Sequence, residues 1–254
     1  MTESEWRECV DPWRMLADLG ERAGARKKRL FACACVRRIR PLLADKRLRQ
    51  ALRLAERFAD EQATPEQMRR ALLLVSLLRE ELREREKRKG GWKALARRAA
   101  AQAVEGLLPV QGPHLERPRD VRDAPDVVTA TRLARTAARA AEAQREKRRG
   151  RVSPVPPESP RRLRSLEAAD LLREIFGNPF RAVPVDPFWL THNENAAAKL
   201  ARSIYDQRHF HDLPLLADAL TEAGCEDAVI LAHCRAPTKH VLGCWVIDTL
   251  LGMK

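Results

Sequence analysis

The sequence has few aromatic residues and no long apolar run. Phe, Trp and Tyr together make up 5% of its 254 residues. No stretch of about 18 apolar residues occurs, so no segment is predicted to span a bilayer. The first residues, MTESEWRECVDPW, lack a basic stretch followed by an apolar one, so no secretory signal is predicted. We therefore expect a cytoplasmic protein that does not contact a membrane.

The sequence also lacks the short motifs of common enzyme classes. It contains no P-loop, no GxGxxG, no HExxH and no GxSxG. Glycine is scarce, and the few glycines lie where we expect helices to end. These absences predict a protein that is not an enzyme and has no cofactor, with a zinc ion as the alternative discussed below.

The residues that dominate the sequence are Ala, Leu, Arg and Glu, which favour helix. Alternating apolar and polar runs are almost absent, so strands are not predicted. Thr2 with Glu5 forms the pattern of a capping box, and Asp11 before Pro12 marks a second helix start. We predict an all-α fold, with a helical N-terminal region and a compact C-terminal bundle of short helices.

Proline and charge divide the chain into segments. The stretch REKRRGRVSPVPPESPRRLR combines proline, serine and arginine without core residues, which is typical of a linker. We predict a basic helical region (1–108), a proline-rich connector (109–125), a polar helix (126–150), a proline- and arginine-rich linker (151–164) and a C-terminal helical module (165–254).

Positive charge is concentrated in the first 164 residues. The chain has a net charge of +13, and residues 165–254 hold 8 Lys and Arg against 12 Asp and Glu, so residues 1–164 have a net charge of +17. Such a surface attracts phosphates, and an exposed tryptophan stacks on bases. The candidate contacts to a nucleic acid are Arg26, Lys27, Lys28, Arg29, Trp92, Arg148, Arg149, Arg151, Arg161 and Arg162.

The stretch AGCEDAVILAHCRAPTKHVLGCW, residues 223–245, is rich in cysteine and histidine. Its candidate zinc ligands are Cys225, His233, Cys234, His240 and Cys244. No CxxC pair occurs, and on a helix only His240 and Cys244 share a face. Cys33 and Cys35, two residues apart on a predicted helix, point in nearly opposite directions. The favoured interpretation is a core of buried thiols and hydrogen-bonded histidines, with structural zinc as the alternative.

Cysteine-dependent catalysis fits this stretch poorly. His240, Cys244 and Asp248 recur every four residues, which places the thiol between the base and the carboxylate, whereas catalysis requires the histidine in the middle. The neighbouring residues of the predicted helix are apolar. Burial among them is expected to raise the pKa of the Cys244 thiol and make it inert.

Four segments near the two ends of the chain are distinctive: TESEWRECVDPWRMLADL, KKRLFACACVRRI, LLREIFGNPFRAVPVDPFWLT and IYDQRHFHDLPLLADALTEAGCEDAVILAHCRAPTKHVLGCWVIDTLLG. In these segments the chain resembles a family of uncharacterised proteins abundant in planctomycete bacteria. The resemblance implies a bacterial origin and a defined C-terminal module, and it assigns no activity, cofactor or catalytic residue. The family pattern leads us to expect a further cysteine after FACAC, where this chain has Val36, so a metal site that needs that cysteine is not expected.

An all-α chain without a catalytic motif is most often an interaction module. We therefore predict a non-enzymatic protein-interaction or scaffold module with a protein partner. Nucleic-acid binding through residues 1–164 is the first alternative, and a structural zinc site in the C-terminal module is the second.

Overall fold

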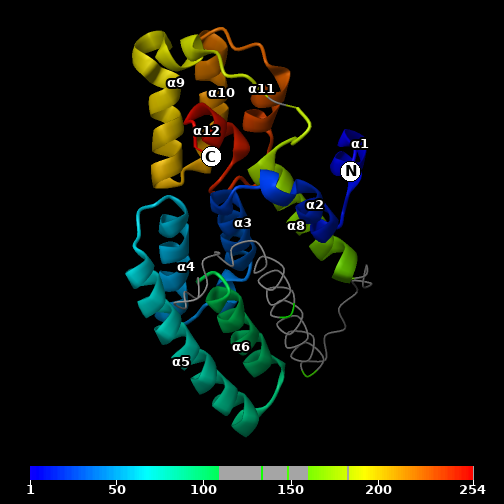
Figure 1. The fold of residues 1–254 in the computed structure, drawn as a ribbon, viewed down its shortest axis with the longest axis vertical. Coiled ribbons are helices and arrows are strands. Elements are labelled where there is room, and N and C mark those ends of the chain that lie inside the picture. Colours follow the sequence, from blue (N-terminus) through cyan, green and yellow to red (C-terminus); the bar gives the residue numbers. More distant parts are fainter. Residues whose placement is uncertain (109–132, 134–147, 149–159, 182, 254) are drawn as a thin grey trace.

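A computed structural model describes residues 1–108, 133, 148, 160–181 and 183–253 (Figure 1). Within these residues every regular element is a helix, and no strand occurs. The prediction of an all-α fold is therefore confirmed. The predicted connector (109–125), almost all of the polar helix (126–150) and most of the linker (151–164) lie outside the described residues.

The N-terminal helices begin where the capping residues predicted. Thr2 and Glu5 form a capping box at the start of α1, and the Asp11 side chain accepts a hydrogen bond from the backbone N–H of Trp13 in α2. The elements of this region are α1 (Glu3–Glu8), α2 (Pro12–Leu19), η1 (Gly20–Arg22), α3 (Ala25–Arg37), η2 (Arg40–Leu42), α4 (Lys46–Ala59), α5 (Pro65–Lys89) and α6 (Trp92–Glu105).

The C-terminal helices are shorter, apart from the first two. The elements are α8 (Pro160–Phe176), α9 (Pro187–Gln207), η4 (Phe210–Asp212), α10 (Leu213–Glu222), α11 (Ala228–Arg235) and α12 (Trp245–Leu250). Residues 236–244 form a loop, and α12 begins only at Trp245. The prediction that His240 and Cys244 share a helical face is therefore wrong. Gly243, which has a φ of +85°, lies between them and interrupts the helical backbone, and Pro237 lies at the start of the same loop.

Among the described residues, buried apolar side chains form three hydrophobic clusters, and α3 takes part in two of them. One cluster lies among α3, α4, α5 and α6, the second among α1, α2, α3 and α8, and the third among α9, α10, α11 and α12. Figure 1 shows α3 between the α4–α6 group at one end of the molecule and α9–α12 at the other. Cys33 belongs to the first cluster and Cys35 to the second, as their spacing predicted.

The helix α8 packs with the N-terminal helices, although the predicted C-terminal module begins within it. Leu172 and Ile175 are fully buried in the same cluster as Trp6 and Phe31. The Trp6 indole Nε1–H also donates a hydrogen bond of 3.1 Å to the carbonyl of Gly177, just after α8. The N-terminal helices therefore fix the position of the end of α8, which also lies next to α9–α12.

A buried ion-pair network joins the two ends of the molecule. The Arg26 guanidinium on α3 donates to both carboxylate oxygens of Asp248 on α12, at 2.7 and 3.1 Å. It also donates to Asp60 at 2.9 Å and to the Tyr205 hydroxyl at 2.7 Å. The Arg26 side chain is 12% exposed and that of Asp248 only 1%. This network fixes α12 on α3 and on the end of α4.

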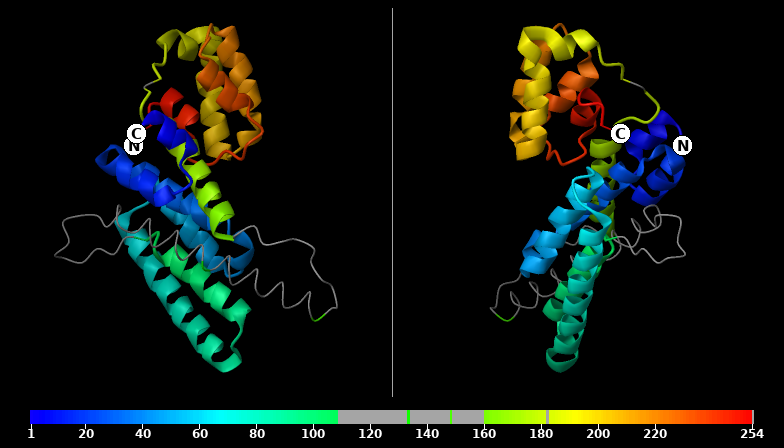
Figure 2. Two further views of the ribbon diagram at one scale, coloured as in Figure 1. Left: turned by 90° about the vertical axis from the view of Figure 1, so that its right-hand side faces the viewer. Right: turned by 60° about the vertical axis from the view of Figure 1, so that its left-hand side comes forward.

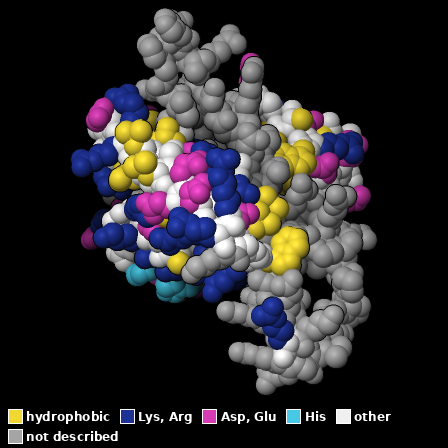
Figure 3. Space-filling view, turned by 90° about the horizontal axis from the view of Figure 1, so that it is seen from below, with side chains coloured by type: hydrophobic (Ala, Val, Ile, Leu, Met, Phe, Trp, Pro, Cys, Tyr) yellow, Lys and Arg dark blue, Asp and Glu magenta, His cyan; other side chains and the backbone are white. Residues whose placement is uncertain are grey.

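The α5–α6 hairpin extends away from the rest of the described helices (Figures 1 and 2). Several of its basic side chains pair with acids: Arg79 with Glu105, and Arg98 with Glu86. In the described part of the face shown in Figure 3, Lys and Arg lie among Asp and Glu and do not form a continuous basic surface. No described helix has both the length and the apolar composition needed to cross a membrane.

Candidate metal centre

Four side chains meet where the end of α8 faces the C-terminal helices. Glu174, His233, His240 and Cys244, called the four-residue cluster below, each offer one ligand atom, and these atoms all lie within 4.8 Å of one another. The Nε2 of His233 lies 3.2 Å from Cys244 Sγ and 3.5 Å from Glu174 Oε2. The Nδ1 of His240 lies 3.1 and 3.2 Å from the two Glu174 oxygens. Ligand atoms on one tetrahedral zinc ion are about 3.3–3.7 Å apart, so the cluster is close to metal-site geometry.

Each ligand comes from a different structural element. Glu174 lies in the last turn of α8 and His233 in the last turn of α11. Cys244 is the N-cap residue of α12, and His240 lies in the loop before it. A metal ion at this point would therefore connect α8 to α11, to α12 and to the loop between them.

Two glycines allow the surrounding backbone to approach closely. Gly243 has a φ of +85°, and a Cβ atom built there would lie 3.0 Å from the Leu30 side chain of α3. Gly177 ends α8 with a φ of +63°, and a Cβ there would lie 3.0 Å from the Trp245 ring. A side chain at either position would be strained and would displace an element that carries a cluster residue.

The cluster is largely withdrawn from solvent, which sets its protonation. Burial lowers the pKa of His233 to about 4, and the nearby Glu174 carboxylate only partly opposes this. Burial, followed by the charge of Glu174, raises the pKa of the Cys244 thiol well above its ordinary value. Near neutral pH His233 is therefore a neutral imidazole and Cys244 a thiol. The imidazole is already neutral, as metal binding requires, whereas the thiol must lose a proton to bind a metal.

The hydrogen bond from Trp245 fixes the tautomer of His233. The Trp245 indole Nε1–H donates to Nδ1 of His233 at 3.1 Å. A neutral imidazole that accepts at Nδ1 has its proton on Nε2, the nitrogen that faces Cys244. His233 therefore has no lone pair directed at the thiol and does not act as its base. This geometry gives a physical reason, in addition to the burial of Cys244, why the pair is not arranged for nucleophilic catalysis.

The five predicted zinc ligands divide into two groups. His233, His240 and Cys244 come together, whereas Cys225 and Cys234 are buried in the hydrophobic cluster of α9–α12 and do not belong to the four-residue cluster. Sequence reasoning missed Glu174. Its one signal was an acidic residue among apolar neighbours in LLREIF, a position where a charge needs a buried partner.

Two of the predicted nucleic-acid contacts are inaccessible. Arg26 is bound in the ion-pair network with Asp248, and Lys28 is 5% exposed and donates to the carbonyl of Gly20. We therefore remove these two residues from the predicted interface. Their helix α3 is covered on nearly all sides, which its basic sequence did not reveal.

The other predicted contacts are more exposed or lie outside the description. Lys27 and Arg29 are partly buried and lie over the rings of Phe176 and Phe58. Trp92 and Arg148 are exposed. Arg149 and Arg151 lie outside the described residues, and the side chains of Arg161 and Arg162 on α8 are not described. Nucleic-acid binding stays a prediction for these positions.

The chain was compared with protein-family models, with curated proteins and with solved structures, and none of them matches it.

Proposed function

We propose that this protein binds one zinc ion through Glu174, His233, His240 and Cys244. The observation that carries the proposal is the convergence of these four side chains, whose ligand atoms all lie within 4.8 Å of one another. Glu174 is 66 residues from His240 in the chain, so no local sequence pattern accounts for its meeting with the other three. Buried groups of this kind are stable when they are paired or bind a metal.

The donor set favours zinc over other common ions. One thiolate, two imidazoles and one carboxylate are typical zinc ligands, whereas magnesium and calcium prefer oxygen atoms alone. Four protein ligands fill the tetrahedral positions of zinc, which is typical of structural sites, whereas catalytic sites usually keep one position open. A structural ion between α8 and the α11–α12 loop is compatible with a non-enzymatic interaction or scaffold protein, the role that we propose for the whole chain.

Zinc binding through Nε2 of His233 requires a change at Trp245. The imidazole proton would have to move from Nε2 to Nδ1, where it would oppose the indole N–H that now donates to this atom. The Trp245–His233 hydrogen bond therefore favours the metal-free state, and we expect the indole to move when zinc binds. The fluorescence of Trp245 provides a signal for this step.

The first experiment measures zinc content. Chain purified without a tag, stripped with a chelator and dialysed against zinc is expected to retain about one zinc ion per chain, as measured by mass spectrometry of the metal. Cys244→Ser and Glu174→Gln are each expected to lose it, because each removes a ligand. Cys234→Ser is the matched control, since this buried thiol lies outside the cluster. Wild-type protein without zinc, or equal zinc in Cys244→Ser, would exclude the site.

The pH dependence of zinc affinity provides a second test. The raised pKa of Cys244 means that zinc displaces one thiol proton, while His233, with a pKa of about 4, releases none near neutral pH. Zinc affinity is therefore expected to rise about tenfold per pH unit between about pH 7 and 8.5, as measured by competition with a chelator of known affinity. An affinity independent of pH over this range would mean that the thiol is not a ligand.

A further inference from the structure

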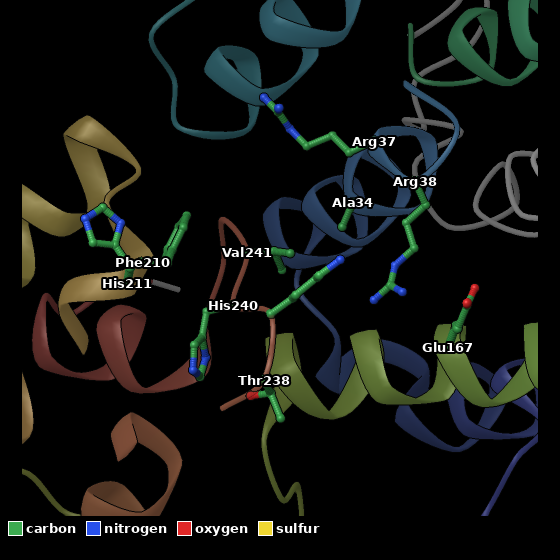
Figure 4. Close-up of a pocket in the computed structure, with 10 residues that line it drawn as sticks. Ala34, Arg37, Arg38, Glu167, Phe210, His211, Thr238, His240 and Val241 are labelled. Carbon is green, nitrogen blue, oxygen red and sulfur yellow. The ribbon is translucent and has the colours of Figure 1, made fainter. Parts of the chain in front are cut away.

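A cavity of about 640 Å³ opens beside the four-residue cluster (Figure 4). Arg38 reaches it from the end of α3, Phe210 and His211 from η4, and Thr238, His240 and Val241 from the α11–α12 loop. Arg37, Lys239, Ala34 and Glu167 complete its lining. One side of this cavity is therefore basic and polar, and another is formed by aromatic and aliphatic side chains.

Two cations in the cavity have no acidic partner among the described residues. Arg38 and Lys239 are exposed, and neither forms an ion pair with a described acid. Arg37 differs, because Glu56 binds its guanidinium. Unpaired Arg and Lys side chains beside a hydroxyl, here that of Thr238, are the groups that proteins use to bind phosphate and carboxylate.

The histidine of the cavity wall has an unsatisfied nitrogen. The His240 side chain is 4% exposed, and among the described residues its Nε2 is the buried side-chain nitrogen or oxygen without a hydrogen-bond partner. Buried polar atoms nearly always have a partner, so an unpartnered one in a cavity wall indicates a missing ligand or water.

A second cavity, of about 510 Å³, shares the same cations. Arg38, Thr238 and Lys239 line both cavities, and Glu174 and His233 line the second one. Arg38 and Lys239 therefore lie between the two cavities. The first cavity has an apolar wall, and the second is lined by Glu174 and His233 of the four-residue cluster. An anion held by Arg38 and Lys239 would lie beside the proposed zinc site. Zinc with the Cys244 thiolate and the Glu174 carboxylate has no net charge, so bound zinc removes the repulsion between Glu174 and the anion.

We infer that the cavity of Figure 4, called the anion pocket below, binds a small organic phosphate. Arg38, Lys239 and Thr238 bind its phosphate group. When Nδ1 of His240 binds zinc, the imidazole proton lies on Nε2, and this N–H also donates to the phosphate. Phe210 contacts the organic part. A phosphate dianion matches two cations better than a single carboxylate charge does, because each guanidinium or ammonium then has a full negative charge to neutralise.

The anion pocket does not require zinc, but zinc is expected to strengthen it. When Nδ1 of His240 binds a metal, the proton of the imidazole lies on Nε2, which is then always a donor. Metal-bound histidines usually donate this second N–H to an oxygen atom. This coupling rests on the proposed zinc site, whereas binding to the zinc-free protein tests the pocket alone.

The test uses phenyl phosphate as the probe, with the zinc-free full chain and titration calorimetry at low salt. We expect phenyl phosphate to bind more tightly than inorganic phosphate, because only the former contacts Phe210, and more tightly than benzoate, which has one charge. The double variant Arg38→Gln/Lys239→Gln is expected to bind phenyl phosphate at least about tenfold more weakly, through the loss of two charge-assisted hydrogen bonds.

The matched control is Lys93→Gln/Arg97→Gln on α6. These exposed residues lie outside the anion pocket and have the same total charge, so the control is expected to bind as the wild type does. Equal weakening in both double variants would show only a general charge effect and would overturn the pocket. Absence of phenyl phosphate binding to the wild type would overturn it as well, whether or not the protein binds zinc.

Discussion

Saturating zinc is expected to raise the free energy of unfolding by about 4 kcal/mol when free zinc is about a thousandfold above its dissociation constant. The unfolded chain does not bring Glu174 and His240, which are 66 residues apart, to the same place. Zinc therefore binds mainly to the folded state and stabilises it. The measurement is chemical unfolding followed by circular dichroism, with and without zinc, at a pH near 7.5.

The controls separate metal linkage from ordinary loss of packing. Each variant is compared with itself, with and without zinc. Cys244→Ser is expected to show no zinc-dependent stabilisation, whereas Cys234→Ser is expected to retain the full increment even if its baseline stability is lower. Hydrogen exchange of residues 236–244 is expected to slow with zinc in the wild type. A zinc increment that is unchanged in Cys244→Ser would place the ion elsewhere on the chain.

Arg26→Met is expected to destabilise the fold by about 3–5 kcal/mol, the cost of leaving a buried charge without its partner. Asp248 is 1% exposed, and burial raises its pKa even with Arg26 in place. Without the guanidinium the carboxyl must either stay charged in an apolar environment or take up a proton. Methionine preserves much of the side-chain volume, so the loss of stability is mainly caused by the removed charge. The free energy of unfolding is measured by urea unfolding of the wild type and the variant.

A second pair of variants distinguishes charge from packing. Arg14→Met removes an arginine from the exposed pair with Glu5, whose side chains are 60% and 45% exposed, and is expected to cost at most about 1 kcal/mol. Arg26→Met/Asp248→Leu removes the Arg26–Asp248 pair and leaves Asp60 with its hydrogen bond from the Tyr205 hydroxyl. It is expected to recover part of the stability lost in Arg26→Met. If the double variant is no more stable than the single one, the buried charge is not the cause.

The local structure of this protein was largely predictable from sequence. Helix starts at Thr2 and Asp11 depend on side chains that hydrogen-bond to backbone within three residues, so the sequence pattern contains the whole interaction. The opposite orientation of Cys33 and Cys35 follows in the same way from helical geometry. The segment from His240 to Asp248 was predicted less well, because its apolar residues fit a longer helix than the one that forms.

The candidate site could be predicted only in part. His233, His240 and Cys244 stand out in sequence, because histidine and cysteine are uncommon and lie close together there. Glu174 is one of many acidic residues, and its apolar neighbours indicate only that it needs a buried partner, not that the partner is a metal. Cys225 and Cys234 have the same thiol side chain as Cys244. They differ in position, because the backbone places them within the hydrophobic cluster of α9–α12 but outside the four-residue cluster.

The sequence alone therefore determined the helical fold class, the helix starts at Thr2 and Asp11 and the chemical types of three cluster residues, because these depend on contacts between near neighbours in the chain. The tertiary structure decided that Glu174 joins the cluster, that Arg26 and Lys28 are buried, and that Arg38 and Lys239 lie beside His240 in one cavity. These facts depend on how α8 and the α11–α12 loop pack around α3, and such packing follows from contacts between residues far apart in the chain.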